Sequence, residues 1–264
     1  MSAENPATIR TLMFFGGVLF FLIFELLVPY RLSTVSKLKR WVINLALTGF
    51  NTILLNLAFT ALVVQTLSYV ATRQQGILNI FNLSIGLKAL ITVVFMDFML
   101  YVWHLVNHEI PMLWRFHRVH HSDLNMDVIT ATRFHFGELA ISAAIKIGII
   151  FLIGADFLSV LIFESTVVLA AQFEHSSLKV PGWFESLFWI LFVPPSMHRI
   201  HHSVIVKDRN TNYGTIFSIW DRICGTLLSK VDQSSIRIGI GAYQREASLN
   251  FHHLLVMPFK PFVK

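Results

Sequence analysis

The chain has 264 residues, of which 55% are hydrophobic and only 14% charged, whereas soluble domains carry about 25% charged residues, so the composition argues against a water-soluble surface. Its single cysteine, Cys224, excludes an intramolecular disulfide and any metal site built on several cysteines. The net charge of +6 comes from Lys and Arg scattered over loops and the C-terminal segment, which favours contact with an anionic membrane surface over nucleic-acid binding.

Three apolar stretches are long enough to cross a bilayer as helices: residues 11–27, 41–70 and 85–106. We expect the first to be a retained span rather than a cleaved signal peptide, because only one basic residue, Arg10, precedes it and no small-residue cleavage site follows. The second is longer than a bilayer requires, so we expect it to tilt, or to kink near Gly49 and Asn51.

The loop between the first two spans, RLSTVSKLKR, carries four basic residues, whereas the loop after the second span has only Arg73. The positive-inside rule therefore places the first loop in the cytoplasm. The third span then ends on the same side, where it delivers His104 and His108 to the cytoplasmic interface.

A further apolar block, residues 139–172, is interrupted by Gly154-Ala155-Asp156, a cluster that stops helices. The block is expected to form a hairpin that enters the membrane and returns, which brings His135 and His175 to the level of His104 and His108. The alternative is one long buried helix through Gly154, which would separate His135 from His175 by tens of ångströms.

After Pro181 the segment WFESLFWILFVPP is aromatic and too short to span, so it is expected to lie in the membrane interface. From Ser196 onward the chain is polar and basic, and it contains no solenoid repeat. These features predict an all-α integral membrane protein with about four to five membrane helices, including the hairpin, and a cytoplasmic helical cap.

Ten of the 12 histidines fall between positions 104 and 202, in patterns that suit metal ligation. HLVNH places two histidines one helical turn apart, and HRVHH and HRIHH each place three at i, i+3 and i+4. A zinc site takes three or four protein ligands, so ten converging imidazoles fit two metals with five ligands each. Imidazole binds iron, copper, zinc and nickel, so the pattern by itself leaves the metal open.

Other histidine-based sites fit these patterns less well. The zinc-protease motif is absent, because His108-Glu109 is followed by Met112 where a second histidine is required. Bis-histidine haem ligation needs isolated histidines on opposing spans, and the triplets do not match that. His252 and His253 lie outside every cluster and are expected to be ordinary polar residues.

With HLVNH, HRVHH and HRIHH in this order, the sequence resembles the fatty acid hydroxylase and sterol desaturase superfamily of membrane di-iron oxygenases. The resemblance extends to LWRFHRVHHSD, RFHFGE, FEHSSLKVPG and NYGTIFSIWDRICGT, and covers residues 97–226. Phe136 stands where many members have proline. The resemblance implies that two iron ions are held by His104, His108, His117, His120, His121, His175, His198, His201 and His202, with His135 as a tenth ligand.

The resemblance also divides the chain into N-terminal transmembrane helices (residues 1–84), a di-iron catalytic domain (85–230) and a cytoplasmic C-terminal tail (231–264). Carboxylates are expected to orient the imidazoles. Asp97, two turns before His104 on one helical stripe, is the first candidate because an acid inside a span is usually functional. Glu138 and Glu109 are weaker candidates, with solvated interface charges as the alternative.

The function implied by the resemblance is a membrane oxygenase that hydroxylates or desaturates a C–H bond of a lipid: a sterol, fatty acyl chain, ether lipid or carotenoid. It would use O2 and electrons from a separate ferredoxin or b-type cytochrome with its reductase, because no G-x-G-x-x-G fingerprint is present. The alternatives are a non-catalytic membrane metal-binding or metal-transport protein and a degenerate scaffold. With no retention signal, a bacterial inner membrane is the expected location.

Overall fold

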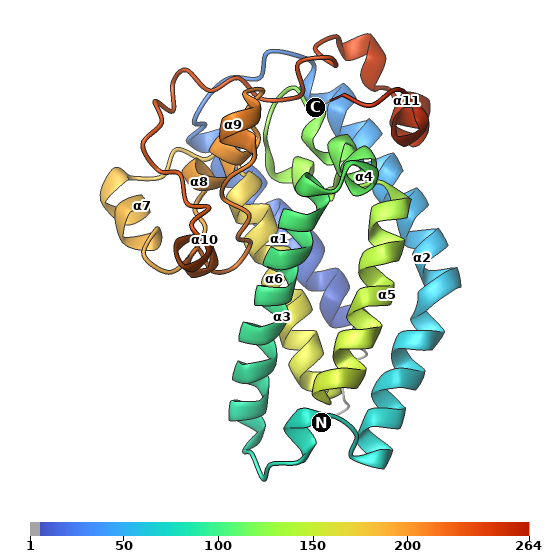
Figure 1. The fold of residues 1–264 in the computed structure, drawn as a ribbon. Helices are drawn as coiled ribbons and strands as arrows, with labels where there is room; N and C mark the ends of the chain where they lie inside the picture. The colour runs from blue at the N-terminus through green and yellow to red at the C-terminus, as the bar shows by residue number, and fades with distance from the viewer. Residues whose placement is uncertain (1–5, 264) are drawn as a thin grey trace.

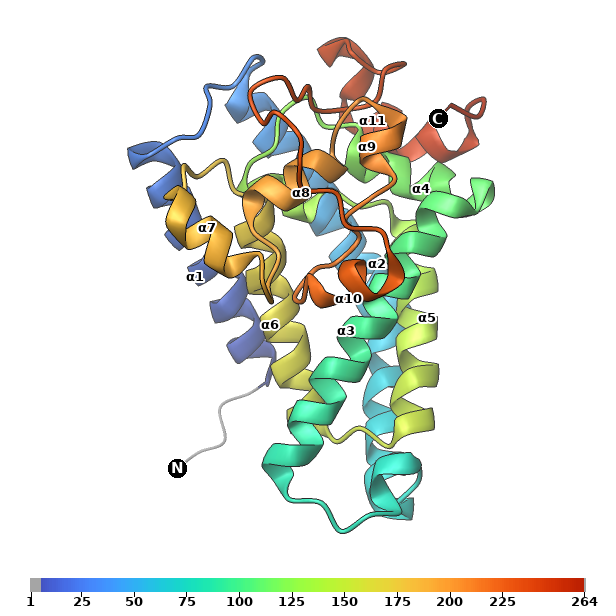
Figure 2. The same cartoon turned by 60° about the vertical axis from the view of Figure 1, so that its left-hand side comes forward.

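All regular secondary structure in the computed structural model, which describes residues 6–263, is helical. Within these residues, five helices are long and apolar enough to cross a membrane: α1 (Pro6–Leu27), α2 (Lys37–Arg73), α3 (Ile85–Glu109), α5 (Phe136–Ile153) and α6 (Phe157–His175). They form a bundle, and most of the shorter helices gather at one of its ends (Figures 1 and 2). The expected all-α membrane fold is thereby confirmed.

The polar segments 110–135 and 176–263 make up the cap, which covers the end of the bundle where α3 and α6 finish and α2 and α5 begin (Figure 1). Its helices are α4 (Pro111–His121), η2 (Val128–Thr132), α7 (Gly182–Phe188), α8 (Pro195–His201), α9 (Val206–Arg209), α10 (Ile219–Cys224), η3 (Glu246–Leu249), α11 (Phe251–Val256) and η4 (Met257–Phe259). The 3-10 helix η1 (Ile77–Asn79) lies at the opposite end.

The helices α5 and α6 form the expected hairpin. Gly154 ends α5 in the left-handed conformation at φ 76°, which a residue with a side chain adopts only with strain. Asp156 then caps α6, its carboxylate accepting a hydrogen bond from the Ser159 amide at 2.9 Å. The alternative of one continuous helix is therefore wrong, and both histidines next to the hairpin lie at the cap end.

Helix α2 is too long for a bilayer alone, since its 37 residues extend over about 55 Å against an apolar thickness of about 30 Å. Its first turns enter the cap, where the Arg40 guanidinium donates to both carboxylate oxygens of Asp123, at 2.5 and 2.8 Å. The helix continues without a break through Gly49 and Asn51, and the Asn51 amide donates to the Phe134 carbonyl at 2.7 Å. These polar contacts fix the loop after α4 to the bundle.

The outer faces of the bundle carry large apolar side chains in contact with the surroundings. Leu12 and Phe15 of α1, Leu57 of α2 and Leu90 of α3 are all exposed. A soluble protein rarely exposes apolar surface on this scale, whereas lipid chains solvate it favourably.

The expected C-terminal tail packs back onto the cap. Leu249, Leu254 and Met257 form one buried cluster with Leu47 of α2 and Val119 of α4. This segment thereby closes over α4, the helix that carries the HRVHH box. The first five residues of the expected N-terminal unit and the last residue of this tail lie outside the described part of the chain.

Candidate metal centre

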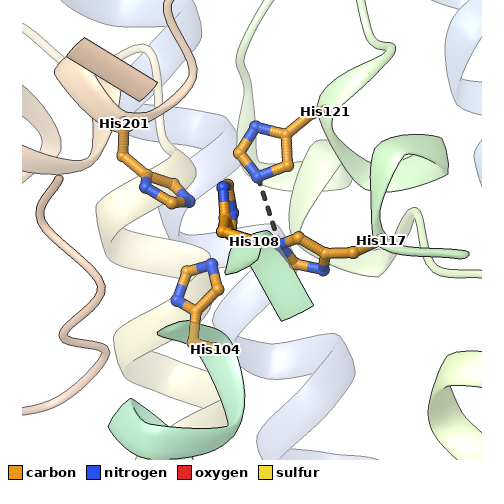
Figure 3. A group of neighbouring side chains, drawn as sticks. All are labelled: His104, His108, His117, His121 and His201. Atoms are coloured by element: carbon orange, nitrogen blue, oxygen red, sulfur yellow. Dashed lines mark hydrogen bonds between the residues drawn. The ribbon is translucent and has the colours of Figure 1, made fainter. Parts of the chain in front are cut away.

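Nine histidines, eight from four helices and His202 directly after α8, meet in two adjoining groups at the cap end of the bundle. Within each group, one ring nitrogen per residue lies within 4.8 Å of every other. The first group, drawn in Figure 3, consists of His104, His108, His117, His121 and His201. The second group consists of His120, His175, His198 and His202. The two groups are in contact, because the rings of His121 and His202 stack with centroids 4.4 Å apart.

The second group has a geometry that suits a bound cation. His120 donates from Nδ1 to the Arg133 carbonyl at 3.2 Å, and His175 donates from Nδ1 to the Ala171 carbonyl at 2.7 Å. In a neutral ring whose proton sits on Nδ1, the Nε2 atom carries a lone pair. The two Nε2 atoms nevertheless face each other at 3.1 Å, so two lone pairs converge with no proton between them.

The spacing of these nitrogens also fits a metal ion. Two ligand atoms at about 2.1 Å from one metal and at right angles to each other are about 3.0 Å apart. The Nε2 atom of His198 lies 3.0 Å from that of His175 and 3.1 Å from that of His202. The residues present therefore fit a bound metal.

In the first group, backbone carbonyls orient the rings in the same way. His104 donates from Nδ1 to the Tyr213 carbonyl and His201 from Nδ1 to the Thr211 carbonyl, each at 2.8 Å. Their Nε2 atoms, and that of His108, are buried and have no hydrogen-bond partner. Buried nitrogens normally have a partner, so three orphaned lone pairs aimed at one point indicate a ligand position.

Burial keeps the cap histidines neutral. It lowers the pKa well below the ordinary value of about 6.5 for His120, His121, His198, His201 and His202. A neutral imidazole is the form that binds a metal, so these side chains are ready to act as ligands near pH 7.

Of the three acids considered as orienting groups, Glu138 contacts a histidine, Asp97 does not, and Glu109 is exposed at the end of α3. The buried Glu138 accepts a hydrogen bond from Nδ1 of His117 at 2.8 Å. Asp97 instead accepts from the backbone amides of Ile216 and Phe217 at 3.2 Å and from the Trp220 indole at 2.8 Å. Asp97 thus fastens the cap to α3, and acts on the histidines only through the position of the cap.

His135 lies outside both groups and serves as the N-cap of α5. Its Nδ1 accepts a hydrogen bond from the Gly137 amide at 2.9 Å, and its Nε2 donates to the Leu255 carbonyl at 3.1 Å. Both ring nitrogens therefore have partners, and neither is directed at the other nine histidines.

The structure adds Glu174, which the sequence patterns did not single out. It is only 2% exposed, and its carboxylate lies 3.7 Å from Nδ1 of His175 and 3.7 Å from Nδ1 of His198. Neither its Oε2 nor Nδ1 of His198 has a hydrogen-bond partner. These two atoms face each other and neither has a closer partner, so the Glu174 carboxylate is available to orient the His198 ring.

A cavity of about 310 Å³ leads from the membrane part of the bundle to both groups, and we call it the histidine cavity. Its apolar walls include Leu100 of α3, Leu139 of α5 and Val167 of α6. At its cap end it meets His104 of the first group and His120 of the second. An apolar chain lying in this cavity would reach both candidate metal positions.

Comparison with known protein families shows to which family the chain belongs. The profile of the family described as fatty acid hydroxylase matches residues 89–226, a segment that contains every histidine of the two groups. The chain belongs to the fatty acid hydroxylase family. The expected membership is therefore confirmed, and the two groups are built from the boxes that suggested it.

Individual relatives of this fatty acid hydroxylase family member act on several lipids. The chain is 32% identical over 154 residues to the ornithine lipid hydroxylase OlsE of Rhizobium tropici, which covers 58% of the chain and 45% of that protein. It is 27% identical over 141 residues to human cholesterol 25-hydroxylase, covering 50% and 47%. It is 30% identical over 179 residues to alkylglycerol monooxygenase of Caenorhabditis elegans, covering 64% and 34%. The chain thus spans less than half of each relative, and no solved structure matches it significantly.

Proposed function

We propose that the chain is a membrane oxygenase that uses O2 and external electrons to hydroxylate a C–H bond of a lipid. The observation that carries this proposal is the histidine cavity, whose apolar walls lead to nitrogens of both histidine groups. Hydroxylation is favoured over desaturation because the relatives are named as hydroxylases and monooxygenases.

The metal assignment is part of the same proposal. Two iron ions would be held, one by the five histidines of the first group and one by the four of the second. Bound iron supplies the capacity to activate O2 for attack on an unactivated carbon. His135 is left out of the ligand set because both of its ring nitrogens have other partners.

The other residues of the site orient the histidines and control what enters the histidine cavity. The carbonyls of Tyr213 and Thr211 and the carboxylate of Glu138 hold their histidines with Nε2 turned inward. The apolar walls of the histidine cavity exclude water and align the lipid chain along the bundle, so that one carbon is presented to the metals. A shift of that carbon by about an ångström changes which hydrogen is removed.

The remaining parts of the proposal concern location and partners. Electrons would come from a separate ferredoxin or b-type cytochrome with its reductase. The segment 31–40, which runs from the loop after α1 into the first turn of α2, carries four basic residues and lies at the cap end, which supports a cytoplasmic position for the metal centre. A relative from Rhizobium supports a bacterial inner membrane. Metal transport is disfavoured, because the histidines crowd one end of the bundle instead of lining a path across it.

The test is to delete the gene, restore it on a plasmid, and compare total lipids by mass spectrometry. Restoration with the wild-type gene should produce a lipid class heavier by one oxygen, and His120→Ala should not. His253→Ala is the matched control, because this histidine lies outside both groups and should behave as wild type. Species lighter by two hydrogens would identify desaturation. Unchanged lipids in all strains would refute the oxygenase.

A further inference from the structure

A second cavity, of about 590 Å³, lies where α1 ends and α2 begins, beneath the loops of the cap. We call it the basic cavity. None of its wall residues belongs to the histidine cavity, so the two are separate spaces. Nothing in the proposed reaction uses it.

The carboxylates that line the basic cavity already have partners within the protein. Glu25 accepts hydrogen bonds from the amides of Val128 and Ser177, both at 2.7 Å, and forms an ion pair with Lys37 at 3.3 Å. Asp127 pairs with Arg40 at 2.8 Å. These carboxylates are therefore occupied and have little attraction left for a ligand.

Three guanidinium groups in the walls, those of Arg31, Arg199 and Arg237, have no such partner. None of them forms an ion pair with a carboxylate anywhere in residues 6–263. Arg31 donates to the carbonyls of Gln233 and Ile236, both at 2.7 Å, and Arg237 donates to a side-chain oxygen at 3.0 Å. Hydrogen bonds to neutral oxygens leave the positive charges uncompensated.

Among these three arginines, Arg199 has the most unfavourable position for an unpaired charge, because it is only 4% exposed. Its guanidinium lies 3.7 Å over the ring of Tyr30 and donates to the Gln233 side chain at 2.8 Å. Burial lowers its pKa to about 10, so it remains charged near pH 7, and Glu185 attracts it only from beyond ion-pair distance. A buried charge without a counter-ion is expensive, and an anion in the cavity would remove that cost.

The surroundings of the basic cavity indicate that this anion is attached to an apolar chain. Leu26 and Leu32 are 64% and 82% exposed, and both line the cavity. Leu26 continues the exposed apolar face of α1, the surface that contacts lipid. A polar, cationic space bordered by such a surface matches a headgroup position at the edge of a bilayer.

We propose that the basic cavity binds the phosphodiester headgroup of an anionic membrane lipid, with Arg31, Arg199 and Arg237 as counter-ions and the acyl chains along α1. The site is independent of the metal centre. It acts as a lipid anchor whether or not the histidine groups carry metal, so its test requires no catalytic activity.

The experiment measures ligand binding to the full-length protein in an uncharged detergent by native mass spectrometry. The probes are short-chain phosphatidylglycerol, phosphatidylcholine with the same chains, and inorganic phosphate. We expect phosphatidylglycerol to bind at least tenfold more tightly than either other probe. Arg31→Gln and Arg237→Gln should each weaken its binding roughly tenfold, the loss of one charge-assisted hydrogen bond. Lys207→Gln, which makes the same charge change at an exposed residue of α9, should have no effect.

Several results would overturn the proposal. Equal binding of the two lipids would mean that the headgroup charge is not recognised. Inorganic phosphate binding as tightly as phosphatidylglycerol would make this a site for a free anion. An equal loss in Lys207→Gln would reveal unspecific surface attraction. Should Arg31→Gln fail to fold, because its two backbone contacts are lost, Arg237→Gln decides the question, since that side chain is exposed.

Discussion

Replacing Glu138 by Gln removes one charge from the support of the first histidine group. In the wild type the Glu138 carboxylate is 4% exposed and accepts from His117 Nδ1 at 2.8 Å, so the interaction is a buried, charge-assisted hydrogen bond. Loss of such a partner typically costs about 10–100-fold in metal affinity, or roughly 1.4–2.7 kcal/mol. The variant keeps the shape of the side chain, so the effect reports the charge and the orientation of the imidazole.

The assay is a competition titration of the metal-free protein with ferrous iron and a coloured chelator, under exclusion of O2. Glu109→Gln provides the matched control, because this glutamate is exposed at the end of α3, next to His108 in the chain. Glu138→Gln should lower the affinity of one of two sites while Glu109→Gln leaves both unchanged. Unaltered iron binding in Glu138→Gln, or equal losses in both variants, would refute the orienting role.

Three further predictions concern the other residues of the centre. His175→Ala should lower the iron content from two ions to one per chain, whereas His135→Ala should retain both, as elemental analysis will show. Asp97→Asn should destabilise the fold by about 1.5–3 kcal/mol in thermal unfolding without changing iron content, because its three donors lie in the cap. Acidification should unfold the metal-free protein more easily. Burial lowers the pKa of His120 and His202 in the folded chain. As the pH falls through about 6.5, these two side chains therefore take up protons in the unfolded chain but not in the folded one. The free energy of unfolding is thus highest above that pH and decreases below it.

Much of the bundle was predictable because its signals are local. Apolar runs of bilayer length predicted the spans, and Gly154 predicted the reversal between α5 and α6. The boxes predicted which histidines share a helix face. The length of the second apolar run did not decide between a tilt and a kink, and α2 runs through Gly49 as one unbroken helix.

The fate of His135 and His175 shows where local signals end. Both flank the hairpin, but His175 is in the last turn of α6, so the helix aims its ring at the second group. His135 precedes α5 in an extended conformation, at φ −86° and ψ 142°, and its ring is taken up by Gly137 and by Leu255, 120 positions away. A contact of that separation leaves no trace in the spacing of the sequence.

The positions of the acids also depend on contacts between residues far apart in the sequence. The helical stripe that joins Asp97 to His104 is real, but the donors that reach Asp97 come from residues 216–220, more than 100 positions later. Glu174 had no box to mark it, and gains its place only when α8 brings His198 against α6. The carbonyls of Tyr213 and Thr211 are invisible to sequence patterns altogether, because every residue has one.

Each histidine triplet contributes to both histidine groups, and this shows what the third histidine of each box adds. At about 100° per residue, positions i and i+4 point about 40° apart, whereas i+3 points about 60° to the other side. In α4 the pair His117 and His121 joins the first group and His120 the second. In α8 and its C-cap, the pair His198 and His202 joins the second group and His201 the first. Each helix therefore ties both metal positions together, which a box of two histidines such as that of α3 cannot do, since its pair serves the first group alone. The i+3 histidines thus set the distance between the two candidate metals, and a centre that acts through two adjacent ions depends on them for that spacing.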